Sequence, residues 1–150
     1  MKALVQRVTR STVIVDGGKT GSIDRGLLVL LSVGQKDTKK DAEYLFYKIR
    51  NLRIFEDENS KMNYSVEDVD GNILLVSQFT LHADTQKGHR PSFNNAAGPK
   101  KAKKMYNYFI DYAKSKGMNN IQTGEFGAYM KVNLVNDGPV TIMLESKNEK

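Results

Sequence analysis

Apolar residues recur at two different spacings along the chain, and in the first third the spacing is that of β-strands. The runs there are short and alternating or rich in β-branched residues, and Gly17-Gly18 forms a hairpin signal between two of them. The last run is continuously apolar, which predicts a central strand covered on both faces. The strands expected in this part are 3–8, 12–16, 19–23 and 27–33.

Two later segments have the apolar spacing of amphipathic helices. The first begins after Asp37 or Thr38, either of which can cap it, and repeats apolar residues every three or four positions up to Leu52. The second begins at Pro99, because proline is favoured in the first helical turn, and Gly117 stops it.

The remaining apolar runs predict further strands, and their order predicts the fold class. Because strands come mostly in runs and do not alternate strictly with helices, the fold is predicted to be α+β, with a mainly antiparallel or mixed sheet or barrel-like core and two principal helices. No linker divides the 150 residues, so we expect a single domain over 1–150. The further strands are expected at 54–56, 73–79, around Ile121, 132–135 and 140–145, and residues 57–63 and 85–95 are expected to be polar loops.

Composition narrows the classes of function. The chain has no cysteine, which excludes disulfides, thiolate zinc sites and cysteine nucleophiles. It shows no signal-peptide pattern, and no apolar run approaches the roughly 20 residues of a membrane helix, so we expect a cytoplasmic protein without a membrane partner. The net charge of +6 favours a polyanionic partner such as nucleic acid.

Basic residues cluster around the predicted start of the second helix. Helix N-termini bind anions, and lysines there would neutralise phosphates, so we predict a track for nucleic acid. The alternative is an ordinary solvated helix face, since lysine is the usual exposed helix residue. The candidate nucleic-acid-binding residues are Lys87, Arg90, Lys100, Lys101, Lys103 and Lys104.

Metal-ligand and nucleophile patterns are weak in this chain. His82, Asp84 and His89 lie close in sequence, but their spacing matches no established zinc pattern, so a solvated loop is favoured and neither metal nor cofactor is predicted. Ser77 or Thr80 can be considered as a nucleophile with His82 as its base, although nothing local requires that arrangement.

Gly138-Pro139 interrupts an apolar stretch that otherwise has the pattern of sheet. Proline cannot donate to a strand ladder and glycine weakens one, and Asn136 and Asp137 before them are turn residues. One interpretation is a hairpin loop. The other is a rigid backbone elbow that is presented to a ligand.

Two motifs together resemble the signatures of the D-aminoacyl-tRNA deacylases, the D-tyrosyl-tRNA(Tyr) deacylase family. The first is Ser77-Gln78-Phe79-Thr80-Leu81 at the end of a predicted strand, and the second is Asn136-Asp137-Gly138-Pro139-Val140-Thr141. Segments 1–8, 87–93 and 123–130 are also similar to the family, so the resemblance runs nearly end to end.

This resemblance implies an activity and an assembly. The activity is hydrolysis of the ester that joins a D-amino acid, or glycine mischarged on tRNA(Ala), to tRNA, while L-aminoacyl-tRNA is spared. The assembly is a homodimer whose interface holds the 3′-terminal adenosine, with a cis Gly138-Pro139 bond inserted from the partner subunit. A related deacylase group has a trans Gly-Pro and an altered first motif, and the intact Ser77-Gln78-Phe79-Thr80 here argues against that group.

The resemblance and the chemistry of ester hydrolysis together suggest residue roles. Backbone N–H groups around Phe79 and Thr80 are candidates for stabilising the oxyanion, and Ser77 and Gln78 for orienting the adenosine or the reacting carbonyl. Attack by water is favoured over attack by Thr80. His82, Ala83 and His89 occupy positions that vary, and we expect them to change tRNA contacts and not the chemistry. The substrate-binding candidates are Gly138, Pro139, Arg7, which holds the elbow, and Phe126 and Met130, which pack against adenine or simply fill the core.

Two other functions stay open at this point. The basic loop and helix are also typical of an RNA-binding module without catalysis. Ser77 and Thr80 are also compatible with a peptidase or esterase that acts on free, small D-amino-acid derivatives.

Overall fold

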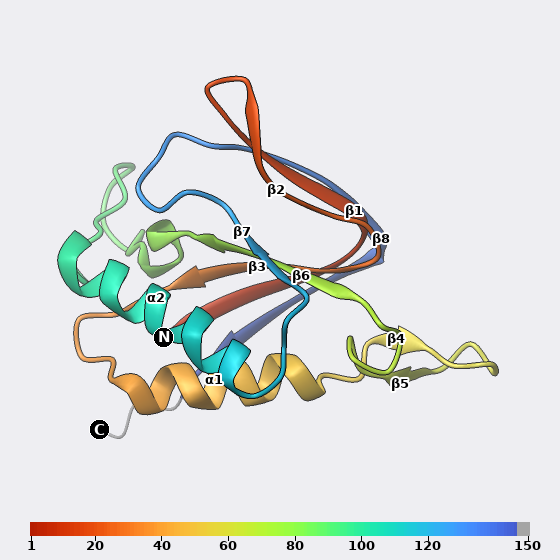
Figure 1. Ribbon diagram of the computed structural model, residues 1–150. Helices are drawn as coiled ribbons and strands as arrows, with labels where there is room; N and C mark the ends of the chain where they lie inside the picture. Colours follow the sequence, from red (N-terminus) through yellow and green to blue (C-terminus); the bar gives the residue numbers. More distant parts are fainter. Residues whose placement is uncertain (147–150) are drawn as a thin grey trace.

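The computed structural model describes residues 1–146, in which a six-stranded mixed sheet and a two-stranded sheet accompany two α-helices (Figure 1). Neither α-helix in this part of the chain is long and apolar enough to cross a membrane. The elements are β1 (Lys2–Val15), β2 (Gly18–Ile23), β3 (Gly26–Ser32), α1 (Lys39–Asn51), β4 (Phe55–Glu56), β5 (Met62–Tyr64), β6 (Asn72–Ser77), the 3-10 turn η1 (Phe79–His82), α2 (Pro99–Ser115), β7 (Ile121–Thr123) and β8 (Lys131–Glu145).

Strand β1 organises the large sheet because it pairs with three other strands. Its first half runs antiparallel to β3, its second half runs antiparallel to β2, and β8 runs antiparallel to almost its whole length. Strands β3 and β6 are parallel, as are β6 and β7, and the connections between them contain α1 and α2 respectively. The predicted α+β class with a mixed sheet and two principal helices is confirmed.

The sheet curves until it nearly closes, where β2 approaches β6 and β7. At Gly21 an added Cβ would lie 2.5 Å from the Thr123 carbonyl oxygen and 2.8 Å from Leu74 Cδ1, so only glycine permits this approach. The interior of the curve holds one apolar cluster. Its buried members are Val8, Val13, Ile23, Leu28, Leu74 and Val76.

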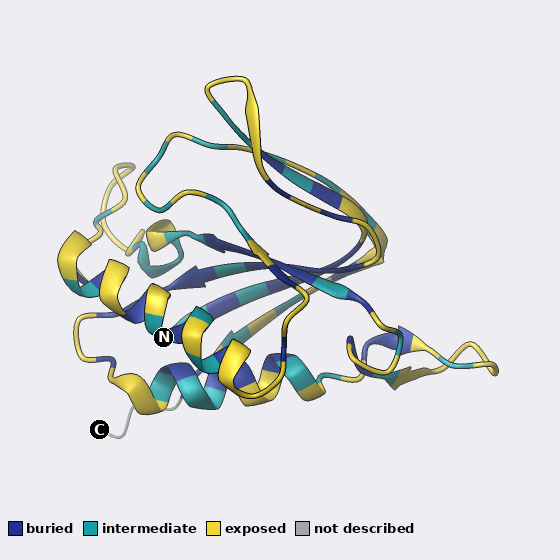
Figure 2. Ribbon diagram, in the orientation of Figure 1, coloured by how far each residue is buried: buried dark blue, intermediate teal, exposed yellow. Residues whose placement is uncertain are grey.

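Both helices pack on the other face of the sheet and cover the larger core (Figure 1). Each helix buries the face turned toward the sheet and leaves its outer face exposed (Figure 2). Phe46 of α1 meets the rings of Phe109 and Tyr112 of α2 edge-on, with centroids 6.0 and 5.8 Å apart. The predicted starts are confirmed: the Thr38 N–H donates to the Asp41 carboxylate at 2.8 Å, and Pro99 is the first residue of α2.

Four local predictions were wrong. Residues 2–15 form one strand and not two, and residues 131–145 form one strand that continues past Gly138-Pro139, so this dipeptide is not a hairpin loop. Met62 and Asn63, at the end of the expected polar loop 57–63, belong to strand β5, which pairs with β4. Phe79 begins the turn η1 and does not end β6. The long strands β1 and β8 continue because they pair with each other from opposite ends of the chain, which local patterns do not report.

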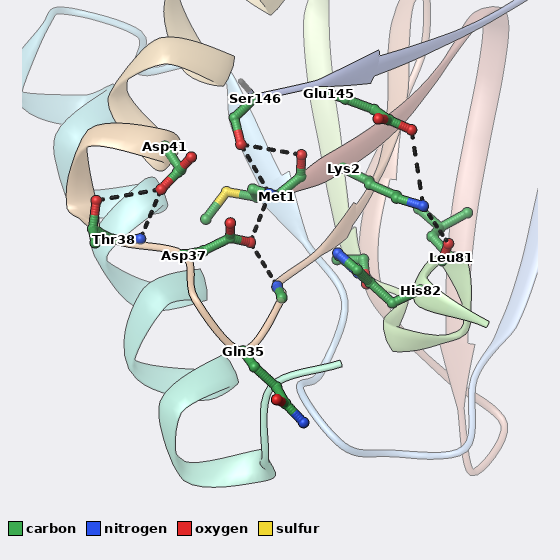
Figure 3. A network of polar contacts seen from close by, with 12 residues as sticks. Met1, Lys2, Gln35, Asp37, Thr38, Asp41, Leu81, His82, Glu145 and Ser146 are labelled. Carbon is green, nitrogen blue, oxygen red and sulfur yellow. Dashed lines mark hydrogen bonds and ion pairs between the residues drawn. The ribbon is translucent and has the colours of Figure 1, made fainter. Parts of the chain in front are cut away.

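The chain start is tied into the fold by a buried ion pair (Figure 3). The Met1 α-ammonium lies 2.6 Å from Asp37 Oδ2 and donates to Ser146 Oγ at 2.8 Å. Asp37 also accepts the Gly34 N–H at 2.6 Å. One carboxylate therefore joins the start of β1 to the loop between β3 and α1, next to the end of β8.

Candidate active site

A cavity of about 590 Å³ opens between the end of β6, the start of α2 and residues 126–132. Ser77, Gln78 and Phe79 of the first motif line one wall. Phe126 and Met130 line another. The structure therefore brings together five of the residues predicted for catalysis and substrate binding, and the volume is in the usual range for a small-molecule site.

The first motif spans the junction between β6 and η1. The Gln78 N–H donates to the Leu31 carbonyl at 2.8 Å, which holds the end of β6 against β3. Phe79 then turns outward and is 52% exposed, and its ring meets Phe93 edge-on with centroids 5.1 Å apart. The Gln78 side-chain amide donates to the Thr80 hydroxyl, which is exposed beside the cavity.

Phe126 and Met130 have one side in the cavity and the other against the core. Phe126 packs on the Tyr106 ring with centroids 5.6 Å apart, and Met130 packs against the interior cluster of the curved sheet. Burial raises the pKa of the Tyr106 hydroxyl, which stays protonated and donates to the Leu75 carbonyl at 2.9 Å. From sequence, these two residues were expected either to pack against adenine or to fill the core; in the structure they contact the core and also line the cavity.

The second motif forms a bulge in β8. Gln6 faces Thr141 and Val8 faces Asn136, so residues 137–140 lie opposite Arg7 alone. The Gly138-Pro139 bond is cis, and Gly138 has a φ of +133°, which favours glycine. The Asn136 side chain closes the bulge, because it accepts the Val140 N–H at 3.0 Å and donates to the Thr141 hydroxyl at 2.8 Å.

Arg7 supports this elbow from β1. Its side chain is buried, with the residue 6% exposed, and it donates from Nε to the Asp137 carbonyl at 3.0 Å and from Nη1 to the Ile54 carbonyl at 2.7 Å. An added Cβ on Gly138 would lie 3.0 Å from Arg7 Nη2, so the elbow packs directly on the guanidinium. Gly138 and Pro139 are exposed and do not line the cavity of their own chain.

A comparison with protein families tests the resemblance that these two motifs suggested. The model of the D-Tyr-tRNA(Tyr) deacylases matches residues 4–145. The chain belongs to the D-Tyr-tRNA(Tyr) deacylase family. The resemblance stated from the two motifs is thereby confirmed, and so is the prediction of an enzyme that hydrolyses ester bonds.

Relatives in this family match the chain from end to end. The D-aminoacyl-tRNA deacylase of Thermosipho melanesiensis is 56% identical over 98% of each chain, and that of Koribacter versatilis is 58% identical over 99% of each. Among solved structures, a c-Myc DNA unwinding element binding protein is 47% identical with a TM-score of 0.93, over 99% of this chain and 100% of that one. A probable eukaryotic D-amino acid tRNA deacylase is 15% identical with a TM-score of 0.84, over 96% of this chain and 98% of that one, which shows the shared fold.

The basic residues predicted to bind tRNA lie beside the cavity and on the loop before α2. Lys100, Lys101 and Lys104 border a surface hollow of about 530 Å³ that shares Gly98 and Pro99 with the cavity. Lys103 is exposed on α2. Lys87 and Arg90 are exposed in a loop closed by paired backbone hydrogen bonds of 2.7 and 2.9 Å between Asp84 and Ser92.

Sequence reasoning missed several residues around the cavity. Phe93 and the highly exposed Tyr129 also line it, but both lie in segments without periodicity, where only the family resemblance marks them. His82 was grouped with the loop, yet its ring is half-buried with Nδ1 2.6 Å from Ser32 Oγ. Within residues 1–146, no three His, Asp or Glu side chains gather as a metal site.

Proposed function

We propose that this protein hydrolyses the ester bond of D-aminoacyl-tRNA and releases free D-amino acid and tRNA, within a single deacylase domain over 1–150. Membership of the deacylase family supports the proposal, and so does the place of the first motif in the wall of the cavity. The cavity volume suits a terminal adenosine with its aminoacyl group. Glycine mischarged on tRNA(Ala) is also a substrate, and L-aminoacyl-tRNA is spared.

Hydrolysis of an aminoacyl ester needs no side-chain nucleophile, because the ester is already activated. Phe79 and Thr80 are the first residues of η1, so their N–H groups have no partner within the turn and are candidates for holding the oxyanion. Ser77 and Gln78 orient the substrate carbonyl or adenosine, and a water molecule attacks. Phe126 and Met130 pack against the adenine.

The active unit is a homodimer in which the elbow of one subunit enters the cavity of the other. Gly138 and Pro139 are exposed and lie outside their own cavity, which supports this arrangement. In residues 1–146, β8 pairs with β1 alone, so its outer edge is free, and it exposes Val135 and Met143. A free edge and exposed apolar side chains are typical of a surface that a partner covers.

The elbow explains discrimination between enantiomers. A gained or lost apolar contact changes selectivity by only about 1–3 kcal/mol, which is too little against an excess of L-aminoacyl-tRNA. A backbone wall held by Arg7 and by the Asn136 side chain cannot swing aside as a side chain can. Its carbonyl groups occupy the space that an L side chain would need, whereas glycine has no side chain to exclude.

The decisive experiment compares D-Tyr-tRNA, L-Tyr-tRNA and a free D-tyrosyl ester as substrates of the purified protein. Rapid release of D-tyrosine from tRNA alone is the expected result. Equal release of both enantiomers contradicts the proposal, and equally fast cleavage of the free ester favours a small-molecule esterase. Binding of tRNA or duplex DNA without release favours a nucleic-acid-binding module, a function suggested by the name of the DNA unwinding element binding protein at 47% identity.

Replacement of Thr80 by alanine tests the role of its hydroxyl. The variant is expected to keep hydrolysis of D-Tyr-tRNA within about tenfold of the wild type, because the backbone N–H groups remain and water attacks. Single-turnover rates measure the effect. A loss of roughly 10⁶-fold, as seen when a true nucleophile is removed, would instead identify Thr80 as the nucleophile.

Replacement of Lys104 by glutamine tests the tRNA track. If its ammonium group touches a phosphate, the slope of log affinity against log salt should become shallower by about 1. Lys40 on α1 is likewise exposed and serves as the matched control, which should keep the wild-type slope. A slope unchanged by the Lys104 substitution would remove this lysine from the track.

A further inference from the structure

A second polar network joins η1 to the end of β3, and the side chains that form it, from Ser32 and His82, do not line the cavity. Its centre is Ser32, the last residue of β3, which is 1% exposed. The Ser32 Oγ lies 3.2 Å from the Phe79 carbonyl oxygen and 2.6 Å from His82 Nδ1. On the other edge of the His82 ring, an added Cβ on Gly34 would lie 3.0 Å from Nε2, so the ring packs closely against this glycine.

The single proton of the Ser32 hydroxyl determines which groups donate in this network. A serine hydroxyl has one proton, so both contacts of Ser32 are satisfied when it donates to the Phe79 carbonyl and accepts from His82 Nδ1–H. Two hydrogen bonds then run from His82 through Ser32 to Phe79. His82, at the end of η1, thereby holds the carbonyl of Phe79, at the start of η1, through the buried Ser32 side chain of β3.

We propose that Ser32 and His82 are positioning residues of the deacylase reaction, which hold η1 so that the N–H groups of Phe79 and Thr80 face the ester. The inference rests on the proposed function. Neither residue lines the cavity, so both act through the turn and not on the substrate. His82 therefore affects the chemistry, whereas the sequence suggested that it would change only tRNA contacts.

The charges around His82 favour its neutral form. The groups that face it are the Met1 ammonium and Lys2 of β1, Asp37 before α1 and Glu145 of β8. Both carboxylates are already paired, Asp37 with Met1 at 2.6 Å and Glu145 with Lys2 at 3.8 Å. Burial first, and then the two cations, lower the pKa of His82 from its ordinary value of 6.5.

Because the pKa of His82 is lower in the folded chain than in the unfolded chain, its contribution to stability decreases toward acidic pH. Above pH 6.5 the ring is neutral in both the folded and the unfolded chain, and its contribution to stability is fully present. Below pH 6.5 the unfolded chain takes up the proton first, so the contribution is lost as the pH falls through the lower pKa of the folded state. A protonated ring beside Met1 and Lys2 is repelled, and η1 loses its support.

The test uses three variants of the full chain, with D-Tyr-tRNA as substrate. S32A removes both hydrogen bonds and H82F removes the one between His82 and Ser32. Each is expected to lower kcat about 10- to 100-fold, while KM changes by less than about twofold because tRNA is held elsewhere. H82N places an amide donor where Nδ1 was and should restore kcat. Because asparagine does not titrate, the decline of wild-type kcat toward acidic pH should be weaker in H82N.

Hydrogen exchange provides a readout that does not depend on activity. The amides of residues 79–83 should exchange faster in S32A and H82F than in the wild type and H82N. S22A, which removes an exposed hydroxyl 3.2 Å from Thr12 Oγ1, is the matched control and should change neither kcat nor this exchange. Wild-type kcat and exchange in S32A and H82F would overturn the positioning role alone, whereas a wild type that releases no D-tyrosine contradicts the proposed function.

Discussion

Replacement of Arg7 by methionine is expected to lower the rate of D-Tyr-tRNA hydrolysis by about 100-fold, because a shift of about 1 Å in a positioning element costs about that much. Methionine keeps the apolar stem but leaves the Asp137 and Ile54 carbonyls without their donor. The elbow then loses the guanidinium on which Gly138 packs. Initial rates with D-Tyr-tRNA and L-Tyr-tRNA measure both the loss of activity and the loss of discrimination.

Two further variants separate this effect from a general change of charge. Arg7→Lys keeps the positive charge but cannot donate from a planar fork to two carbonyls, so it should resemble the methionine variant more than the wild type. Arg10→Met removes an arginine from the same strand where it is exposed, and should keep wild-type rates. If the Arg7→Met protein hydrolysed D-Tyr-tRNA at the wild-type rate and still spared L-Tyr-tRNA, the elbow would need no support from the Arg7 side chain.

Replacement of Asp37 by asparagine is expected to lower the free energy of unfolding by about 3–5 kcal/mol, because it leaves a buried charge without its partner. The charge is the Met1 ammonium, which is fully buried 2.6 Å from the carboxylate. The amide oxygen of asparagine can still accept the Gly34 N–H, so the loss reports the ion pair. Urea unfolding of the two proteins measures the difference.

The matched control is Glu67→Gln, which breaks the partly exposed ion pair between Arg50 and Glu67. An exposed pair contributes only about 0–1 kcal/mol, so this variant should unfold at nearly the wild-type urea concentration. Equal destabilisation by the two substitutions would contradict the view that burial makes the Met1–Asp37 pair the stronger contributor.

Local signals were sufficient for the helices and for the place of the first motif. The starts of α1 and α2 depend on Thr38, Asp41 and Pro99, which act within one turn, and apolar spacing marks the faces that the helices bury. Ser77 to Thr80 were expected where a buried strand ends, and they lie there. These features were predictable because the interactions that produce them join residues close in sequence.

The elbow shows where local reasoning stops. Asn136 to Pro139 have the composition of a turn, and composition alone cannot tell a hairpin from a bulge. The difference lies in β1, which pairs with β8 on both sides of the bulge, and in Arg7, which contacts Asp137 from 130 positions away. The pair formed by Ser32 and His82 was hidden for the same reason, because it joins the end of β3 to the end of η1, 50 positions away.

By itself, the sequence determined the family through its two motifs, the two amphipathic helices and the buried strands, because motif identity and periodicity are written in neighbouring residues. Only the tertiary structure decided that the first motif lines a cavity, that the elbow lies exposed outside it, and that His82 turns inward beneath η1. Those outcomes depend on how β1, β3, β6 and β8 pair and cross, and pairing between distant strands is set by burial and hydrogen bonding over the whole fold.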